Sequence, residues 1–340
     1  NNIKIEKVLF KDDLNKIEID NLLLNKNLKV LNLKKAKFSY LDAENIKNNF
    51  RILNKNDNFA LEGKFFNANN LIENLLNTDE ENSLPFEKAF KLDVSLEKVR
   101  FDEEFEVRNF SGSLKFKKNN FTDANLNGFF ENNKKIKITI NSFNNEKITT
   151  LYSDYAKPFI KRYKFIKGFD KGSLDFYSRK INKKTTSSIK IYDFKLNELP
   201  ALTKLLTLAS LQGIADLLTG EGIRFNEFEM NFNTKDSLMT IDEIYAIGPA
   251  ISILMDGYIE KNKLISLRGT LVPATTLNKV IGSIPFLGDI LVGSKTGEGV
   301  FGVSFKIKGP PKKLETSVNP IKTLTPRFIT RTLEKIKKNN

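Results

Sequence analysis

The feature that most constrains this chain is a regular alternation of apolar and polar residues in short segments of roughly its first 150 residues. Residues 92–97, 113–117 and 136–140 place Leu, Val, Ile or Phe at every second position, with charged or hydroxyl-bearing residues between them. Successive side chains of a β-strand point to opposite faces, so each segment predicts a strand with one apolar and one solvated face. An amphipathic helix would need apolar residues every three to four positions instead.

Turn signals separate these segments at intervals of roughly ten to fifteen residues. KKNN at 117–120 and ENNK at 131–134 are two of them, and this spacing is typical of an antiparallel meander. Residues 68–77, ANNLIENLLN, interrupt the pattern because their apolar residues fall on a single helical stripe. We therefore expect a β-meander with one short helix in this half.

The second half combines helices with strands. Three times, over 154–178, 208–230 and 278–305, a helical pattern leads through a glycine-containing loop into an alternating strand. The second and third copies share the sequence TGEG, at 219–222 and 296–299. Glycine supplies the left-handed or tight backbone that a helix end followed by a reversal requires. We expect a repeated helix-loop-strand unit.

Several catalytic chemistries are excluded because the chain contains no His, Cys or Trp. This removes Ser-His-Asp and Cys-His nucleophiles and zinc sites built from imidazole or thiolate. Asp102, Glu103 and Glu104 fall in a turn, where solvated charge is the ordinary explanation, and the serines of the later strands have no general base nearby in sequence. We expect no enzyme, no catalytic residue, no metal and no cofactor.

A glycine motif near the carboxyl end resembles a nucleotide loop. Gly297, Gly299 and Gly302 match G-x-G-x-x-G, but a dinucleotide site needs a strand before the glycines and a helix after them. Here the order is reversed, so the glycines indicate a turn into a strand and no nucleotide is expected.

The net charge of +14 would suit nucleic acid or anionic lipid, but only 9 of the 55 basic residues are Arg. Arg is favoured for reading base edges and for clamping phosphates in a bidentate manner, so the Lys bias argues against specific nucleic-acid binding. Much of the charge is explained by a solvated surface. The last forty residues alone carry a net +8.

The most apolar stretch, 199–218, contains Lys204, Asp216 and a break at Gly213. It therefore falls short of the roughly 18 uncharged residues that a membrane-spanning helix requires. We expect a buried or interfacial helix pair. The sequence begins at Asn1 without a signal-like segment, which indicates a fragment of a longer protein.

The carboxyl-terminal half resembles the carboxyl-terminal domain of the AsmA-like family, in its YhdP-type branch. The order of motifs carries the resemblance: SLQGIADLLTGEGIRFNEFE at 210–229, AIGPAISILMDGYIE at 246–260, LRGTLVPATTLNKVIGSIPFLGDILVG at 267–293, and a glycine-led strand followed by VNP and LTP within 297–331. The resemblance covers roughly residues 150–335. The amino-terminal half is compatible with it but carries no motif.

This resemblance implies a bacterial envelope protein related to bridge-like lipid transport proteins, anchored in the inner membrane by an amino-terminal helix and extending into the periplasm. The fold expected is mainly β, a long antiparallel meander of about 18 to 20 strands at ~4.8 Å spacing curled into an open groove, with short helices capping its carboxyl-terminal end. Residues 1–150 would form a groove segment and 151–340 the AsmA-like domain continuous with it. A β-sandwich with a closed core is the alternative.

The function expected is a non-enzymatic one: an apolar groove for phospholipid or another acyl-chain lipid, moving it between inner and outer membranes. The alternative is a structural or assembly factor for outer-membrane proteins and envelope integrity, without direct lipid transfer; a carboxylate-based hydrolase is a third possibility that no acidic cluster supports. The candidates for lining the groove are Phe228, Met230, Phe232, Ile251, Ile253, Phe301, Val303 and Phe305. The candidates for membrane or partner contact, several of them on an amphipathic carboxyl-terminal helix, are Phe286, Leu287, Phe328, Ile329, Leu333, Arg327 and Arg331.

Overall fold

The protein folds into one open sheet of nineteen strands, with three short α-helices among the described residues. This computed structural model describes residues 2–56, 58–70, 72, 89–117, 120–162, 168–197, 200–208, 211–273, 302–311 and 313–321. Within those residues β1 pairs only with β2 and β19 only with β18, so both remain edge strands. The predicted fold class, mainly β and open, with few short helices, is confirmed.

The chain divides into two compact units, which are described separately. Unit 1 comprises residues 1–158 and 179–182, and unit 2 comprises 159–178 and 183–340. The strands that begin in unit 1 are β1 (Ile3–Lys11), β2 (Lys16–Leu24), β3 (Val30–Asn32), β4 (Lys35–Leu41), β5 (Lys47–Lys55), β6 (Asn58–Asn67), β7 (Phe90–Arg100), β8 (Glu106–Lys117), β9 (Asn120–Phe129), β10 (Lys135–Phe143) and β11 (Glu146–Ser153).

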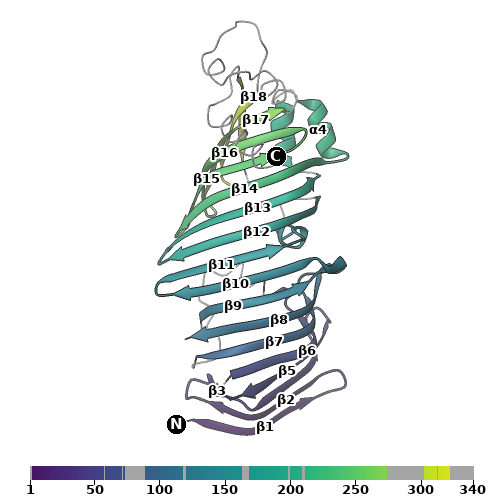
Figure 1. Ribbon diagram of the computed structural model, residues 1–340, viewed down its shortest axis with the longest axis vertical. Coiled ribbons are helices and arrows are strands. Elements are labelled where there is room, and N and C mark those ends of the chain that lie inside the picture. The colour runs from purple at the N-terminus through teal and green to yellow at the C-terminus, as the bar shows by residue number, and fades with distance from the viewer. Residues whose placement is uncertain are drawn as a thin grey trace. The chain divides into compact units, whose positions relative to one another are not determined.

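The remaining elements alternate between helices and long strands. A short helix, α2 (Lys157–Ile160), precedes β12, and a single 3-10 turn, Glu131–Asn133, lies between β9 and β10. The later elements are β12 (Phe169–Ile181), β13 (Lys184–Leu196), α3 (Pro200–Leu208), α4 (Gln212–Thr219), β14 (Ile223–Lys235), β15 (Leu238–Ile247), β16 (Ile251–Glu260), β17 (Leu264–Pro273), β18 (Gly302–Gly309) and β19 (Glu315–Ile321). Figure 1 shows the strands of each unit following one another in chain order.

Most of the strand pairs whose registers are described are antiparallel, as the turn spacing predicts, but one of them differs. β6 and β7 run parallel, with Phe59 opposite Leu92 and Phe66 opposite Val99. Parallel strands need a crossover connection, which a tight turn cannot supply. The crossover contains the helix predicted over 68–77; its first residues are helical, with the Ile72 N–H donating to the Ala68 carbonyl, and the rest lies outside the described residues.

Each unit has an apolar face that extends across its strands, because directly opposite residues of paired strands project to the same side of a sheet. In unit 1, Ile17 lies opposite Phe38, and Phe38 lies opposite Phe50 on its other side. The later strands continue the same face. The opposite face holds ion pairs such as Arg51 with Glu62 at 2.8 Å. The apolar face of unit 1 is formed by Ile17, Ile19, Phe38, Phe50, Ile52, Leu61, Leu92, Val94, Leu96, Phe110, Leu114, Leu126, Ile136, Ile138 and Ile140.

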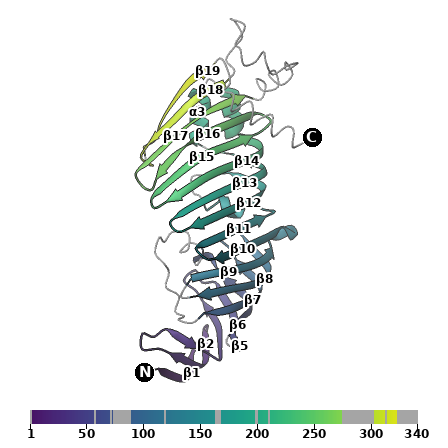
Figure 2. The ribbon, with the colours of Figure 1, turned by 60° about the vertical axis from the view of Figure 1, so that its left-hand side comes forward.

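The alternation changes phase inside several strands, where Asn or Asp adopts a left-handed backbone. Asn21, Asn109 and Asp193 have φ values of 49°, 50° and 51° within β2, β8 and β13. At Asp193 the apolar side shifts, so that Ile191 and Phe194 are both buried although they are three positions apart, which regular alternation would put on opposite faces. Such irregularities bend a strand and increase its twist. These irregularities allow a strand to bend while its apolar residues stay on one side of the sheet. Figures 1 and 2 show the bowed strands.

Aromatic side chains stack across neighbouring strands on these faces. In unit 2 the ring of Phe194 stacks between Phe169 and Phe225, with ring centroids 5.3 Å away on each side. In unit 1 Phe50 stacks on Phe38 at 4.9 Å and meets Phe66 edge-on at 5.3 Å. Aromatic pairs of this kind contribute roughly 0.5–1.5 kcal/mol beyond the area that they bury.

The stretch 199–218 forms the expected pair of helices. Leu205 and Leu206 of α3 and Leu218 of α4 are buried, α4 contacts β14, and α3 contacts β19. The pair therefore reaches both the first and the last strand of the segment β14 to β19, which Figure 2 shows in sequence. Among the described residues no helix is long and apolar enough to cross a membrane.

The first TGEG sequence ends α4 and opens β14 as predicted. Gly222 has φ = 88°, and a Cβ atom there would lie 1.6 Å from the Asn197 side-chain oxygen. Both the left-handed backbone and the close approach therefore require glycine at this position. The second TGEG sequence lies outside the described residues.

Candidate functional site

The apolar face of unit 2 contains every described groove candidate. Phe228 lies opposite Ala246, and Ala246 lies opposite Ile253 on its other side. Ile253 lies opposite Leu271, which in turn lies opposite Val303. This face, called the unit 2 apolar face below, is formed by Phe228, Met230, Phe232, Ile241, Ile244, Ala246, Ile251, Ile253, Met255, Ile265, Leu267, Leu271, Val303, Phe305, Ile307 and Val318.

The unit 2 apolar face is covered along only part of its length. Ile251, Leu271 and Val303, close to one end of their strands, are buried, with 0, 0 and 4% of their surface exposed. Toward the other end of the strands, Met230 and Ile307 are only half-buried. Other half-buried members of this face are Phe228, Phe232, Met255, Ile265 and Leu267. A row of aromatic and aliphatic side chains thus remains accessible to an apolar ligand.

Close packing fixes the covered part of this face. The Phe305 ring lies against Gly269 of the neighbouring strand, where a Cβ atom would come within 2.6 Å of the ring. The same Cβ atom would lie 2.5 Å from the Leu254 carbonyl oxygen. Gly269 therefore allows a large aromatic ring to lie flat across a strand, and a larger residue would displace it.

Unit 1 offers a second apolar face, which the sequence reasoning did not nominate as a site. Val94, Leu96 and Leu126 are buried at its centre, whereas Phe50 and Phe110 are half-buried around them. The alternation of residues 92–97, 113–117 and 136–140 had already marked these strands as one-sided. The signal was present in the sequence, but the resemblance drew the candidates to the carboxyl-terminal half.

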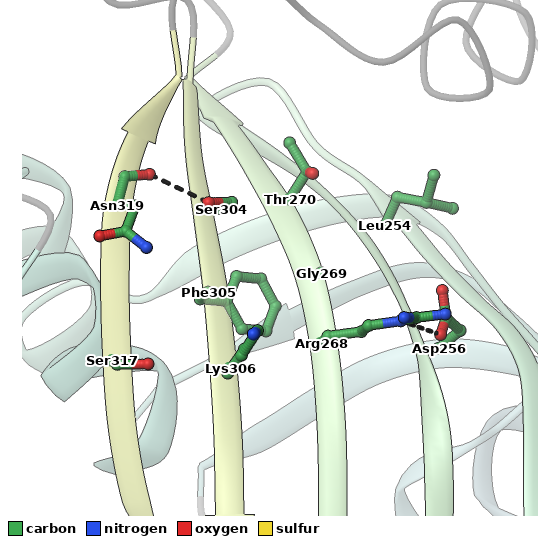
Figure 3. Close-up of a pocket in the computed structure, with 10 residues that line it drawn as sticks. All are labelled: Leu254, Asp256, Arg268, Gly269, Thr270, Ser304, Phe305, Lys306, Ser317 and Asn319. Carbon is green, nitrogen blue, oxygen red and sulfur yellow. Dashed lines mark hydrogen bonds and ion pairs between the residues drawn. The ribbon is translucent and has the colours of Figure 1, made fainter.

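The opposite face of unit 2 has a buried apolar cluster, Tyr245, Leu254 and Val272, toward one end of its strands. Its other residues are mainly polar, and they line a shallow depression of about 360 Å³. Figure 3 shows the Arg268 guanidinium reaching Asp256 of the neighbouring strand, and the Nε to Oδ1 distance is 2.9 Å. The Ser304 hydroxyl donates to the Asn319 carbonyl at 3.2 Å. The Arg268 side chain is 74% exposed. Ion pairs that remain in water contribute little and mark a solvated surface.

A larger depression of about 810 Å³ lies in unit 1 and is lined mainly by residues of its polar face. There Glu62 accepts hydrogen bonds from Arg51 and Lys55, which lower the pKa of its carboxyl below the usual value. The carboxylate is held ionised by its partners and is unsuited to act as a general acid near neutral pH.

The acidic turn noted in the sequence has a structural role. Asp102 lies between β7 and β8 and accepts hydrogen bonds from the backbone N–H groups of Glu104 and Phe105 at 2.7 and 2.9 Å. Such side-chain to backbone bonds stabilise a turn. Among the described residues no group of three or more acidic side chains is placed to hold a metal ion.

Eight of the candidates lie outside the described residues. They are one groove candidate, Phe301, and all of the membrane or partner candidates: Phe286, Leu287, Phe328, Ile329, Leu333, Arg327 and Arg331. Their assignments stay predictions.

Comparisons with protein families, with curated proteins and with solved structures found no match to this chain. The interpretation of the site therefore rests on the geometry above and on the motifs of the sequence.

Proposed function

We propose that this protein is a non-enzymatic lipid-binding protein whose apolar faces shelter the acyl chains of phospholipids during transport between membranes. The observation that carries the proposal is the unit 2 apolar face. It holds an apolar residue from each of β14 to β18, and Met230, Met255 and Ile307 on it are half-buried. Apolar side chains that are neither buried in a core nor scattered singly mark a binding surface.

The energetics fit an acyl-chain ligand. Moving a chain of about 16 carbons into water costs on the order of 13 kcal/mol at ~0.8 kcal/mol per methylene, so unassisted transfer is slow. A surface that replaces water along the chain lowers this barrier without any covalent step. Strands of ten to thirteen residues, such as β14 and β16, extend about 33–44 Å at ~3.3–3.4 Å per residue, which is long enough to accompany such a chain.

The resemblance to the AsmA-like family supports the cellular setting that we propose. The motif residues at 210–229 include α4 and the start of β14, and those at 246–260 include β16. We propose that the protein works in the bacterial periplasm, anchored at the inner membrane, and moves lipid between the inner and outer membranes.

Photocrosslinking tests where lipid binds. A benzophenone amino acid replaces Met255 on the unit 2 apolar face or, as the matched control, Thr240 on the polar face of the neighbouring strand. After incubation of the full chain with phospholipid vesicles, irradiation is expected to give a lipid adduct by mass spectrometry only at position 255. Adducts at both positions in equal yield, or at neither, would contradict the proposal.

Native mass spectrometry and a transfer assay test the activity itself. The purified chain is expected to carry phospholipid and to speed the movement of a fluorescent phospholipid from donor to acceptor vesicles. A lipid-free protein that leaves the transfer rate at its spontaneous value would refute a role in lipid transport.

A second candidate function, an assembly factor for outer-membrane proteins, is favoured by the two edge strands. Among the described residues β1 and β19 each pair on one side alone, and the backbone groups of an open strand edge can add a strand of another chain. Crosslinking from Lys7 of β1 to an outer-membrane protein, together with a loss of assembly in cells and no lipid adduct at position 255, would favour this function over lipid transport.

A further inference from the structure

Two lysines lie at the margin of the apolar face of unit 1, where apolar side chains otherwise dominate. Lys147 is opposite Ser142 in the β10–β11 pair, in the same register that sets Ile138 opposite Leu151. Alternation along β11 therefore puts Lys147 on the same side as Leu151. Its side chain is half-buried, although it carries a charge.

The neighbour of Lys147 is fixed by an ion pair on the other side of the sheet. Arg179 donates from Nε and Nη2 to the two carboxylate oxygens of Glu146, at 2.6 and 3.1 Å. This bidentate contact holds residue 179 beside residue 146 on the polar face. The next residue along each strand points to the opposite face, so Lys147 and Lys180 both lie on the apolar side. In neighbouring antiparallel strands they form a diagonal pair and not a directly opposite one, which is still within reach of long side chains.

The electrostatics agree with this placement. Burial lowers the pKa of the Lys147 ammonium, and the positive charge of Lys180 lowers it further. Among the described residues no carboxylate lies within ion-pair distance of either lysine, whereas Lys55 and Lys91 on the polar face pair with Glu62 and Asp93. Two like charges, one of them half-buried, destabilise the fold unless an anion neutralises them.

We propose that Lys147 and Lys180 bind the phosphate group of a phospholipid whose acyl chains lie on the apolar face of unit 1. The inference rests on the proposed lipid-binding function and adds the position and chemistry of the headgroup. Ammonium groups donate charge-assisted hydrogen bonds to phosphate oxygens. Ser142 adds a hydroxyl, and Ile138 and Ile140 lead from it along the apolar face. The exposed turn that joins β10 to β11 puts the headgroup next to water.

The test compares two double variants of the full chain. K147Q/K180Q removes both charges from the apolar side. K115Q/K137Q, the matched control, removes two exposed lysines from the polar face of the same unit. Binding is measured by fluorescence for labelled phosphatidylglycerol and for diacylglycerol with the same acyl chains, and inorganic phosphate is tested as a competitor.

K147Q/K180Q is expected to bind phosphatidylglycerol about tenfold more weakly, which is the loss of affinity that corresponds to one charge-assisted hydrogen bond. Its affinity for diacylglycerol is expected to be unchanged. The control is expected to bind both lipids like the native chain. Thermal unfolding of K147Q/K180Q without lipid should occur at the native temperature or above it, because a repulsion is removed.

Three results would overturn this headgroup site. If K147Q/K180Q binds phosphatidylglycerol at the native affinity, the two lysines do not bind the phosphate group, although the proposed lipid binding itself still stands. An equal loss of diacylglycerol binding shows that the lysines support the fold instead of recognising phosphate. Competition by inorganic phosphate at the same concentration as the lipid assigns the site to the free anion. Failure of the native chain to bind either lipid would instead refute the proposed function itself.

Discussion

A carboxylate placed on the unit 2 apolar face should weaken lipid binding there strongly while leaving the fold intact. Met230 is the position of choice because it lies between Ile189 and Ile244 on neighbouring strands and is half-buried. The substitution Met230→Glu puts a charge among apolar side chains that still have access to water. The matched control, Thr240→Glu, adds the same charge to the polar face of β15, where Thr240 is exposed.

The two effects of Met230→Glu differ in size. Full burial of a Met side chain contributes about 1.5–3 kcal/mol, so a half-buried one contributes on the order of 1 kcal/mol to the free energy of unfolding. A hydrated carboxylate that keeps about three methylenes of a bound acyl chain in water costs ~2.4 kcal/mol of binding, or roughly fiftyfold in affinity. Binding should therefore suffer more than folding.

The assay is titration of the full chain with a fluorescent phospholipid, together with urea unfolding of each variant. Met230→Glu is expected to lose most of its affinity and little stability, and Thr240→Glu to keep both. Native affinity in Met230→Glu, or equal losses in the two variants, would show that lipid does not lie on the unit 2 apolar face.

Three further predictions concern stability. Phe194→Ala removes the middle ring of the Phe169–Phe194–Phe225 stack and should cost about 3–5 kcal/mol in urea unfolding; a loss below about 1 kcal/mol would mean that the stack is loosely packed. Gly222→Ala forces a side chain into a backbone of φ = 88° and onto Asn197, so it should lower the thermal unfolding temperature, whereas Gly213→Ala in α4, where a Cβ atom meets nothing within 4 Å, should leave it unchanged or raise it. Burial raises the pKa of Asp42, but hydrogen bonds from Asn67, the Ile46 N–H and Asn48 outweigh it and hold the pKa below 3.8; this stabilisation is present above pH 3.8 and is lost as the pH falls through the lowered value. Asp42→Asn should therefore be less stable at neutral pH and show a weaker acid dependence, which unfolding curves between pH 2 and 7 would reveal.

Much of the fold could be predicted because its signals are local. The alternation of 92–97 and 113–117 specified β7 and β8, and the TGEG sequence after 218 specified the passage from α4 into β14. The phase shifts inside strands could not be predicted, because Asn21 and Asp193 look like turn residues in the sequence and become mid-strand irregularities only through pairing. The parallel pairing of β6 and β7 was equally hidden, since alternation reports the faces of a strand and not its direction.

For the candidate site, too, the features within one strand could be predicted, whereas those that depend on strand pairing could not. Phe228, Met230 and Phe232 were identifiable as one row from their spacing within one strand. That Ile253 and Val303 continue this row depends on the register of β15, β16 and β17, which no single segment contains. The Lys147 and Lys180 pair was beyond sequence reasoning for the same reason: 33 residues separate Glu146 from Arg179, and their contact decides which lysines become neighbours.

The neighbour-to-neighbour pairing of the strands has a consequence for how such a protein changes over evolutionary time. From β7 to β11 and again from β13 to β19, each strand takes its hydrogen-bond partners from the strands just before and after it in the chain. A duplicated or deleted hairpin would therefore leave all other pairings in register and change the sheet by two strand widths, about 10 Å. Insertion or loss of hairpins would therefore lengthen or shorten such a sheet in fixed steps without disturbing the rest of its pairing.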